Sequence, residues 1–89
     1  MQQSIITFNL YCKWEHIPPV YRLYFDDELM TERSYIWDNE THFLQERVPV
    51  MADPSHPHKI TIEQVGIHTG KFKVDNVEAD GIKINFRFL

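Results

Sequence analysis

Hydrophobic and polar residues alternate along most of this chain, and a period of two is the pattern of half-buried β-strands. The first segment places its large apolar side chains on one face, namely Ile6, Phe8, Leu10, Cys12 and Trp14. Residues 82–88 alternate in the same way, and shorter strands are predicted over 21–25, 29–37, 59–65 and 72–77. Residues 42–51 fit either a short helix followed by a strand or one bulged strand. The chain is therefore predicted to be all-β.

Turn-forming residues interrupt this alternation at intervals of about 8–12 residues. The breaks fall at residues 18–19, 26–28, 38–41, 53–57 and 80–81, where Asp80-Gly81 is a strong hairpin signal. This spacing favours about seven to eight strands in a single antiparallel β-sandwich, jelly-roll-like, or in a small barrel. Residues 1–89 then form one domain, and the apolar rows of the first and last segments suit a pairing of these two strands.

Composition excludes several classes of function. The 89 residues include six Phe, four Tyr and two Trp, and 43% are hydrophobic, which is too apolar for a disordered segment. A net charge of −4 argues against a duplex-DNA binder that neutralises phosphates. The chain has only three glycines, too few for a glycine-rich loop that binds phosphate. Its single cysteine rules out an internal disulfide framework.

The N-terminal residues 1–7 have neither a basic region nor an apolar core, so no signal peptide is expected. No stretch approaches the roughly 20 apolar residues of a membrane span. We therefore expect a soluble domain in a reducing compartment, with no membrane partner.

Two groups of residues suggest a metal, and for both we favour an ordinary surface role. The histidines His56, His58 and His68 lie in neighbouring loops, and an extended His-x-His places two rings on one side. Asp26, Asp27 and Asp38 belong to a stretch, residues 26–46, with seven acids and one base, and Ca²⁺ takes six to eight oxygen ligands. Solvated loop histidines and an acidic surface that discourages edge aggregation are the commoner cases. We expect no bound cofactor.

The sequence shows no order of residues typical of a catalytic nucleophile with its base and orienting group. Cys12 alternates with core residues and is expected to be a small buried hydrophobe. No pair of carboxylates stands out as a glycosidase acid and base. An enzyme is not expected.

The aromatic residues point more directly to a function. Tyr11, Tyr24 and Tyr35 are predicted on the faces opposite the core, where tyrosine anchors protein interfaces. Trp14 and Trp37 both lie at strand ends, where they either cap the core or face a partner. We therefore predict a binding surface that includes Tyr11, Tyr24, Tyr35 and Trp37, with Asp26, Asp27 and Asp38 as polar contacts.

One run resembles a known group of proteins. Residues 21–38 read YRLYFDDELMTERSYIWD, and residues 58–63 and 70–77 complete the likeness. The chain is similar to small β-sandwich proteins of tailed phages, particularly of cyanophages. It is more loosely similar to jelly-roll carbohydrate-binding modules, and Asp80-Gly81 fits the hairpin that closes such modules. The resemblance implies a non-enzymatic structural or accessory protein in the virion or host cytoplasm. It would bind virion or host proteins, or further copies of itself, through strand edges and aromatics. The alternatives are a module for host-surface glycans and a small effector that binds a host enzyme.

Overall fold

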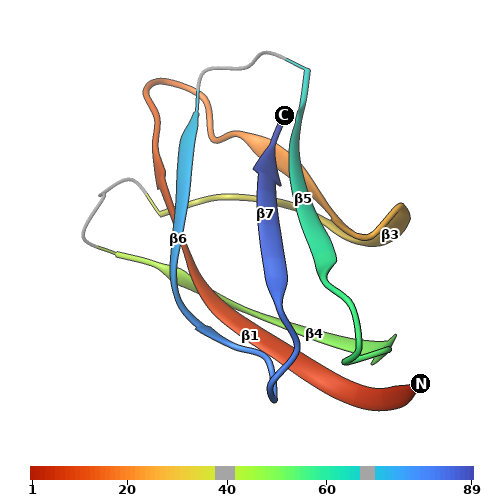
Figure 1. The fold of residues 1–89 in the computed structure, drawn as a ribbon. Coiled ribbons are helices and arrows are strands. Elements are labelled where there is room, and N and C mark those ends of the chain that lie inside the picture. Colours follow the sequence, from red (N-terminus) through yellow and green to blue (C-terminus); the bar gives the residue numbers. More distant parts are fainter. Residues whose placement is uncertain (38–41, 67–69) are drawn as a thin grey trace.

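The structure, a computed structural model, describes residues 1–37, 42–66 and 70–89. The described residues contain seven strands and no helix (Figure 1). The strands are β1 (Gln2–Lys13), β2 (Val20–Phe25), β3 (Glu28–Ser34), β4 (Leu44–Ala52), β5 (His58–Val65), β6 (Lys71–Glu78) and β7 (Ile84–Phe88). The all-β prediction is confirmed.

The strands form two sheets that enclose one core. Sheet A has the order β4-β1-β6, and sheet B has the order β3-β2-β5-β7. Sheet A is antiparallel throughout, whereas β5 and β7 in sheet B run parallel. The prediction of a wholly antiparallel sandwich is therefore wrong at β7. A jelly roll has eight antiparallel strands, so that part of the prediction is not confirmed.

The turn at Asp80-Gly81 leads the chain from β6 of sheet A to β7 of sheet B. Asp80 and Gly81 have φ angles of +50° and +80°, and the Ile82 N–H donates to the Ala79 carbonyl at 2.9 Å. These are the features of a tight two-residue turn. The turn joins strands of different sheets, so the chain crosses the sandwich and β7 lies beside β5. The turn prediction is right, and the hairpin pairing is wrong.

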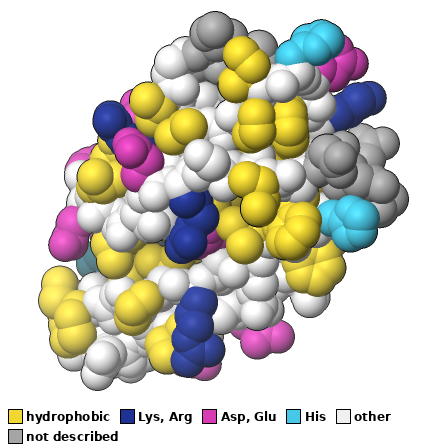
Figure 2. Space-filling view, turned by 180° about the vertical axis from the view of Figure 1, so that it is seen from behind, with side chains coloured by type: hydrophobic (Ala, Val, Ile, Leu, Met, Phe, Trp, Pro, Cys, Tyr) yellow, Lys and Arg dark blue, Asp and Glu magenta, His cyan; other side chains and the backbone are white. Residues whose placement is uncertain are grey.

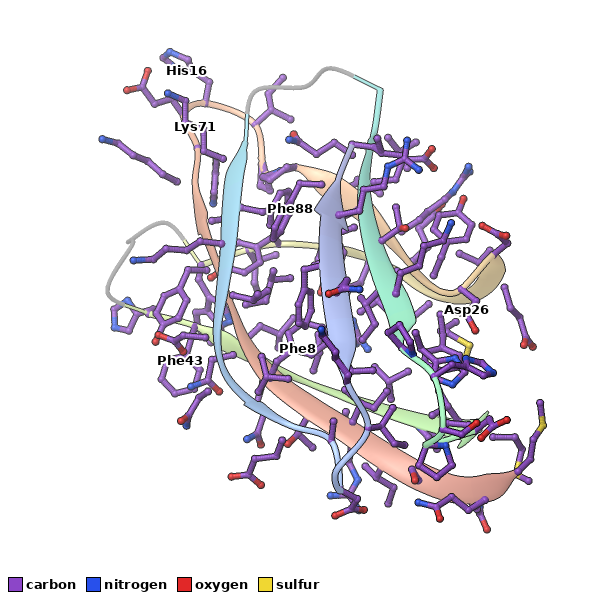
Figure 3. The ribbon with its side chains drawn as sticks, viewed as in Figure 1. Phe8, His16, Asp26, Phe43, Lys71 and Phe88 are labelled. Carbon is purple, nitrogen blue, oxygen red and sulfur yellow. The ribbon has the colours of Figure 1, made fainter. Side chains whose placement is uncertain are left out.

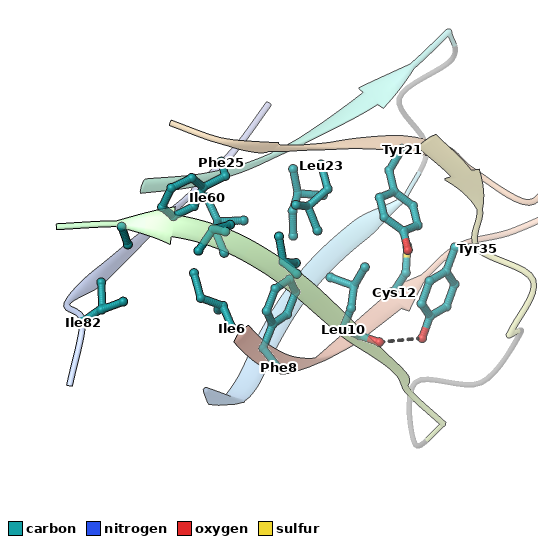
Figure 4. Close-up of a cluster of buried hydrophobic side chains, with 14 residues drawn as sticks. Ile6, Phe8, Leu10, Cys12, Tyr21, Leu23, Phe25, Tyr35, Ile60 and Ile82 are labelled. Atoms are coloured by element: carbon teal, nitrogen blue, oxygen red, sulfur yellow. Dashed lines mark hydrogen bonds between the residues drawn. The ribbon is translucent and has the colours of Figure 1, made fainter. Parts of the chain in front are cut away.

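The inward row of β1 fills the centre of the core (Figure 4). Ile6, Phe8, Leu10 and Cys12 are buried, as the alternation predicts. Phe8 meets Phe86 edge to face, with ring centroids 5.1 Å apart. The predicted pairing of the first and last strands is wrong, because β1 pairs with β4 and β6 and β7 lies in the other sheet. Their apolar rows meet instead across the interior of the sandwich.

Residues 44–52 form one strand, so the helical alternative for 42–51 is wrong. Its pairing with β1 is continuous from Gln2–Ala52 to Leu10–Leu44, without a bulge. Pro49 cannot donate a ladder hydrogen bond. It is accommodated because β4 is an edge strand of sheet A.

Candidate functional site

Two tryptophans from different sheets meet at one end of the sandwich. Trp14 follows β1 of sheet A, and Trp37 lies just beyond β3 of sheet B. The indole Nε1–H of Trp14 donates to the Trp37 carbonyl at 2.6 Å. Nearby, the Tyr35 N–H donates to the Pro19 carbonyl at 2.8 Å. These hydrogen bonds hold segments 14–19 and 35–37 together.

Further aromatic rings continue from Trp37 across the end of sheet A. The ring centroids of Trp37 and His42 are 6.3 Å apart, and those of Tyr11 and Phe43 are 5.5 Å apart. Trp37 is 41% exposed and Phe43 is 46% exposed. Large exposed aromatics of this kind are typical anchors of protein interfaces.

Three lysines flank these rings. Lys71 lies directly opposite Lys13 on the neighbouring strand, and Lys73 lies opposite Tyr11. The Nζ of Lys73 is 5.0 Å from the centroid of the Tyr11 ring, a cation–π contact. None of the three lysines forms an ion pair with another described residue. Like charges placed opposite each other destabilise a sheet, so this arrangement is better suited to binding than to folding.

These groups together form one surface, which we call the basic–aromatic end. Its members are Tyr11, Lys13, Trp14, His16, Trp37, His42, Phe43, Lys71 and Lys73. A pocket of about 330 Å³ lies within it, lined by Lys13, Trp14, Glu15, His16 and Lys71. His16, Lys71 and Phe43 all lie on the side of the molecule away from Asp26 (Figure 3). Seen from behind, a group of hydrophobic side chains lies toward this side, with histidines at its rim (Figure 2).

A second, more apolar pocket adjoins the same loop. It has a volume of about 310 Å³ and is lined by Glu15, His16, Ile17, Pro18, Pro19, Val20 and Val65. Ile17 at its wall and Ile36 beside Trp37 are both largely exposed. Exposed apolar groups gathered beside a pocket mark an interaction surface more often than isolated ones do.

The predicted aromatic residues separate into three different places. Tyr11 and Trp37 belong to the basic–aromatic end. Tyr24 lies on the outer face of sheet B, where its hydroxyl donates to Glu63 at 3.0 Å. Tyr24 is therefore outside the core, as predicted, but it does not share a surface with Trp37.

Tyr35 is completely buried, so its prediction as a surface residue is wrong. Its hydroxyl donates to the backbone carbonyl of Leu10 at 3.1 Å or of His42 at 3.2 Å. The cause is a bulge in β3: Leu23 opposes Thr31 but Tyr24 opposes Leu29, which leaves Met30 as an extra residue. A bulge shifts the alternation by one, and Tyr35 therefore turns inward.

Asp26 and Asp27 make contacts within the protein. Asp26 accepts from His58 Nδ1 at 2.9 Å and from the Lys59 N–H at 3.1 Å, so both of its oxygens are used. Asp27 is 92% exposed and lies 3.2 Å from Lys59 Nζ. Among residues 1–37, 42–66 and 70–89, no group of three or more metal-ligating side chains comes together. Asp38 and His68 lie outside these ranges.

His58 is a buried link between two loops. Its Nδ1 bonds Asp26, and its Nε2 lies 3.0 Å from the Asp53 carbonyl. The hydrogen bond with Asp26 raises the pKa of His58 more than burial lowers it. His56 is exposed, with its ring 4.7 Å from that of His58. Because both nitrogens of His58 are engaged, the two histidines do not present a free pair of metal ligands.

The sequence reasoning missed one buried charge, Glu46. Its side chain is 1% exposed, yet it accepts a hydrogen bond from the Tyr21 hydroxyl at 2.5 Å and lies 2.8 Å from Arg33 Nε. These contacts join β4 of sheet A to β2 and β3 of sheet B. Its place in the alternation could have revealed its burial, because Glu46 shares the inward row of β4 with Val48 and Val50.

No protein-family model, curated protein or solved structure matches this chain. Among the described residues there is also no helix with the length and hydrophobicity to cross a membrane. The arrangement of side chains at the basic–aromatic end therefore carries the functional argument.

Proposed function

We propose that this protein is a non-enzymatic binding domain that holds a neighbouring protein at the basic–aromatic end. The observation that carries the proposal is that exposed Trp37 and Phe43 lie beside Lys13, Lys71 and Lys73 in a chain whose net charge is −4. Aromatic anchors supply most of the binding energy at such interfaces, and the lysines favour a partner with carboxylates.

Preorganisation of this end supports the proposal. The Trp14–Trp37 hydrogen bond joins the two segments that present the exposed apolar side chains. The Tyr11 ring is held between Phe43 and Lys73. A surface already fixed in the free protein loses less entropy on binding, which favours a stable complex.

Two core residues, Cys12 and Tyr21, have strongly raised pKa values, and both values suit a role in folding better than a role in catalysis. Burial raises the pKa of the Cys12 thiol to about 12, so at neutral pH it is not the thiolate that a nucleophile requires. Burial, followed by the hydrogen bond with Glu46, also raises the pKa of Tyr21. Both groups pack in the hydrophobic core.

The resemblance of residues 21–38 to proteins of tailed phages supports a virion as the setting, with a virion or host protein as the partner. A glycan-binding platform is less well supported, because Tyr24 and Trp37 lie on different surfaces and do not form one stacking face. The proposal therefore places a protein at the basic–aromatic end.

The proposal is tested by affinity capture from the cells that make the protein, followed by quantitative mass spectrometry. Wild type is compared with Trp37→Ala and with Tyr24→Ala as a matched aromatic control. We expect one protein to be recovered with wild type and Tyr24→Ala and to be lost with Trp37→Ala. Equal recovery with all three baits contradicts the proposal, provided that circular dichroism shows each variant to be folded.

A further inference from the structure

We propose that the basic–aromatic end binds a second copy of this chain, at the opposite end of its sandwich. This inference rests on the proposed function and names the partner. The second surface, which we call the hairpin end, consists of the β2–β3 turn and the pocket beside it, namely Phe25, Asp26, Asp27, Glu28, Leu29, Met30 and Met51.

The two surfaces lie at opposite ends of β1. Lys13, the last residue of β1, lies opposite Lys71 of the basic–aromatic end. Gln2, the first residue of β1, lies opposite Ala52. The next residue, Asp53, contacts His58, which in turn contacts Asp26 of the hairpin end. Twelve residues of β-strand span about 36 Å. One copy can therefore present both surfaces at once without their overlapping.

The charges of the two ends are complementary. The basic–aromatic end carries Lys13, Lys71 and Lys73, with the acids Glu15 beside its pocket and Asp75 beside Tyr11. The hairpin end carries the consecutive acids Asp26, Asp27 and Glu28, of which Asp27 and Glu28 are exposed. Lys59 pairs with Asp27, His58 pairs with Asp26, and Arg87 lines a pocket together with both aspartates. Glu28 and the second carboxylate oxygen of Asp27 make no ion pair with another described residue, so they can pair with lysines of another copy, and such pairs steer association.

The apolar groups are complementary as well. A pocket of about 280 Å³ lies beside the turn, lined by Gln3, Phe25, Glu28, Met30, Pro49, Val50 and Met51. Met51 is 54% exposed at the rim of this pocket. Methionine adapts its shape and makes favourable contacts between sulfur and aromatic rings. We assign Trp37 or Phe43 of the second copy as the group that enters this pocket.

Contact between two different surfaces is heterologous, so each copy keeps one free end after it binds another. Repetition then builds a ring or an open chain of copies. An assembly of this kind suits a structural component that is present in many copies.

The test is sedimentation of the purified protein over a range of concentrations at low and high salt. Lys71→Glu alters the basic–aromatic end and is expected to fold, because it replaces the like-charged pair Lys13–Lys71 with an opposite pair. Asp27→Lys alters the hairpin end at an almost fully exposed position. Arg47→Glu is the control, since Arg47 is exposed in the middle of β4.

We expect wild type and Arg47→Glu to associate with rising concentration at low salt and to dissociate at high salt. Each end variant is expected to self-associate about tenfold more weakly. An equimolar mixture of Lys71→Glu with Asp27→Lys should associate more strongly than either variant alone, because the intact hairpin end of the first can bind the intact basic–aromatic end of the second. Wild type that stays at 10.7 kDa at every concentration overturns the inference, as does a mixture that stays monomeric. In either event, a different protein captured through Trp37 would still support the proposed function.

Discussion

The indole of Trp14 donates a hydrogen bond of 2.6 Å to the backbone carbonyl of Trp37, and this contact joins the ends of two different sheets. The contact gives the two tryptophans unequal roles. The Trp14 ring is partly buried against the core, whereas the Trp37 ring is exposed and contributes only its carbonyl to the hydrogen bond. Stability and binding can therefore be separated by substitution.

Trp14→Phe keeps an aromatic ring and removes the donor, so we expect a loss of about 1 kcal/mol in the free energy of unfolding. Trp37→Ala keeps the acceptor and removes the exposed ring, so stability should change by less than about 0.5 kcal/mol while partner binding is lost. Urea denaturation and the capture experiment measure the two effects. A large loss of stability in Trp37→Ala would show that this ring belongs to the core.

Removal of the partner of buried Glu46 should be costly. Arg33→Ala leaves the Glu46 carboxylate in the interior with only the Tyr21 hydroxyl, and we expect a loss of about 2 kcal/mol because water only partly replaces the guanidinium. Arg22→Ala is the matched control, since the Arg22–Glu32 pair is exposed on both sides. Such a pair contributes at most about 0.5 kcal/mol. Equal losses in the two variants, measured by urea denaturation at pH 7, would contradict the structural role of Glu46.

Gly70 should tolerate no side chain. A Cβ atom at this position would lie 2.8 Å from Cys12 Sγ and 3.1 Å from Pro19 Cγ. The amide of Gln64 also bonds both the N–H and the carbonyl of Gly70. We expect Gly70→Ala to destabilise the protein by about 2 kcal/mol through overpacking.

Cys12→Ala removes the nearest of these atoms, which allows a direct check. The double variant Cys12→Ala/Gly70→Ala should lose less stability than the sum of the two single variants. Additive losses in thermal or urea denaturation would mean that the cost of Gly70→Ala does not arise from contact with Cys12.

The His58–Asp26 contact should make stability depend on pH. The folded protein raises the pKa of His58 above its ordinary 6.5, so this contribution is complete below pH 6.5 and is lost as the pH rises through the folded value. Burial alone would raise the pKa of Asp26, but hydrogen bonds from His58 and from the Lys59 N–H hold it below 3.8. The contribution from Asp26 is therefore lost only as the pH falls below 3.8. The contact stabilises the fold most between these limits.

Asp26→Asn removes the carboxylate and is the appropriate test. The stability advantage of wild type over Asp26→Asn should be larger at pH 5.5 than at pH 8. His56→Gln, which alters the neighbouring exposed ring, should change this difference only slightly, because the charge of His56 affects Asp26 less than the hydrogen bonds from His58 and Lys59 do. A difference independent of pH would exclude His58 as the titrating group.

The alternation of residues was sufficient to predict most strands and the buried row of β1, because the side chains of a strand face opposite sides in turn. The pairing of β7 with β5 could not be predicted. A turn such as Asp80-Gly81 fixes the local backbone, but the packing of the whole sandwich decides which sheet the next strand enters. Tyr35 was misplaced for a related reason, since the bulge at Met30 leaves no clear mark in the sequence.

Part of the proposed binding surface could also be predicted. Tyr11 was identified from the alternation along the first strand and Trp37 from its place at a strand end, and both lie at the basic–aromatic end. The lysines were missed because Lys13 and Lys71 are far apart in the chain and meet only through the pairing of β1 with β6. Three lysines therefore lie together on one face, although the chain as a whole carries a net charge of −4.

Photo-crosslinking at position 37 tests the binding function most directly. A photoreactive phenylalanine analogue replaces Trp37 in one variant and Tyr24 in another, and both proteins are irradiated in the cells that make them. The account predicts a discrete crosslinked protein from position 37, either a second copy of this chain or one other protein, and none from position 24. Absence of a product from position 37, or the same products from both positions, would contradict it.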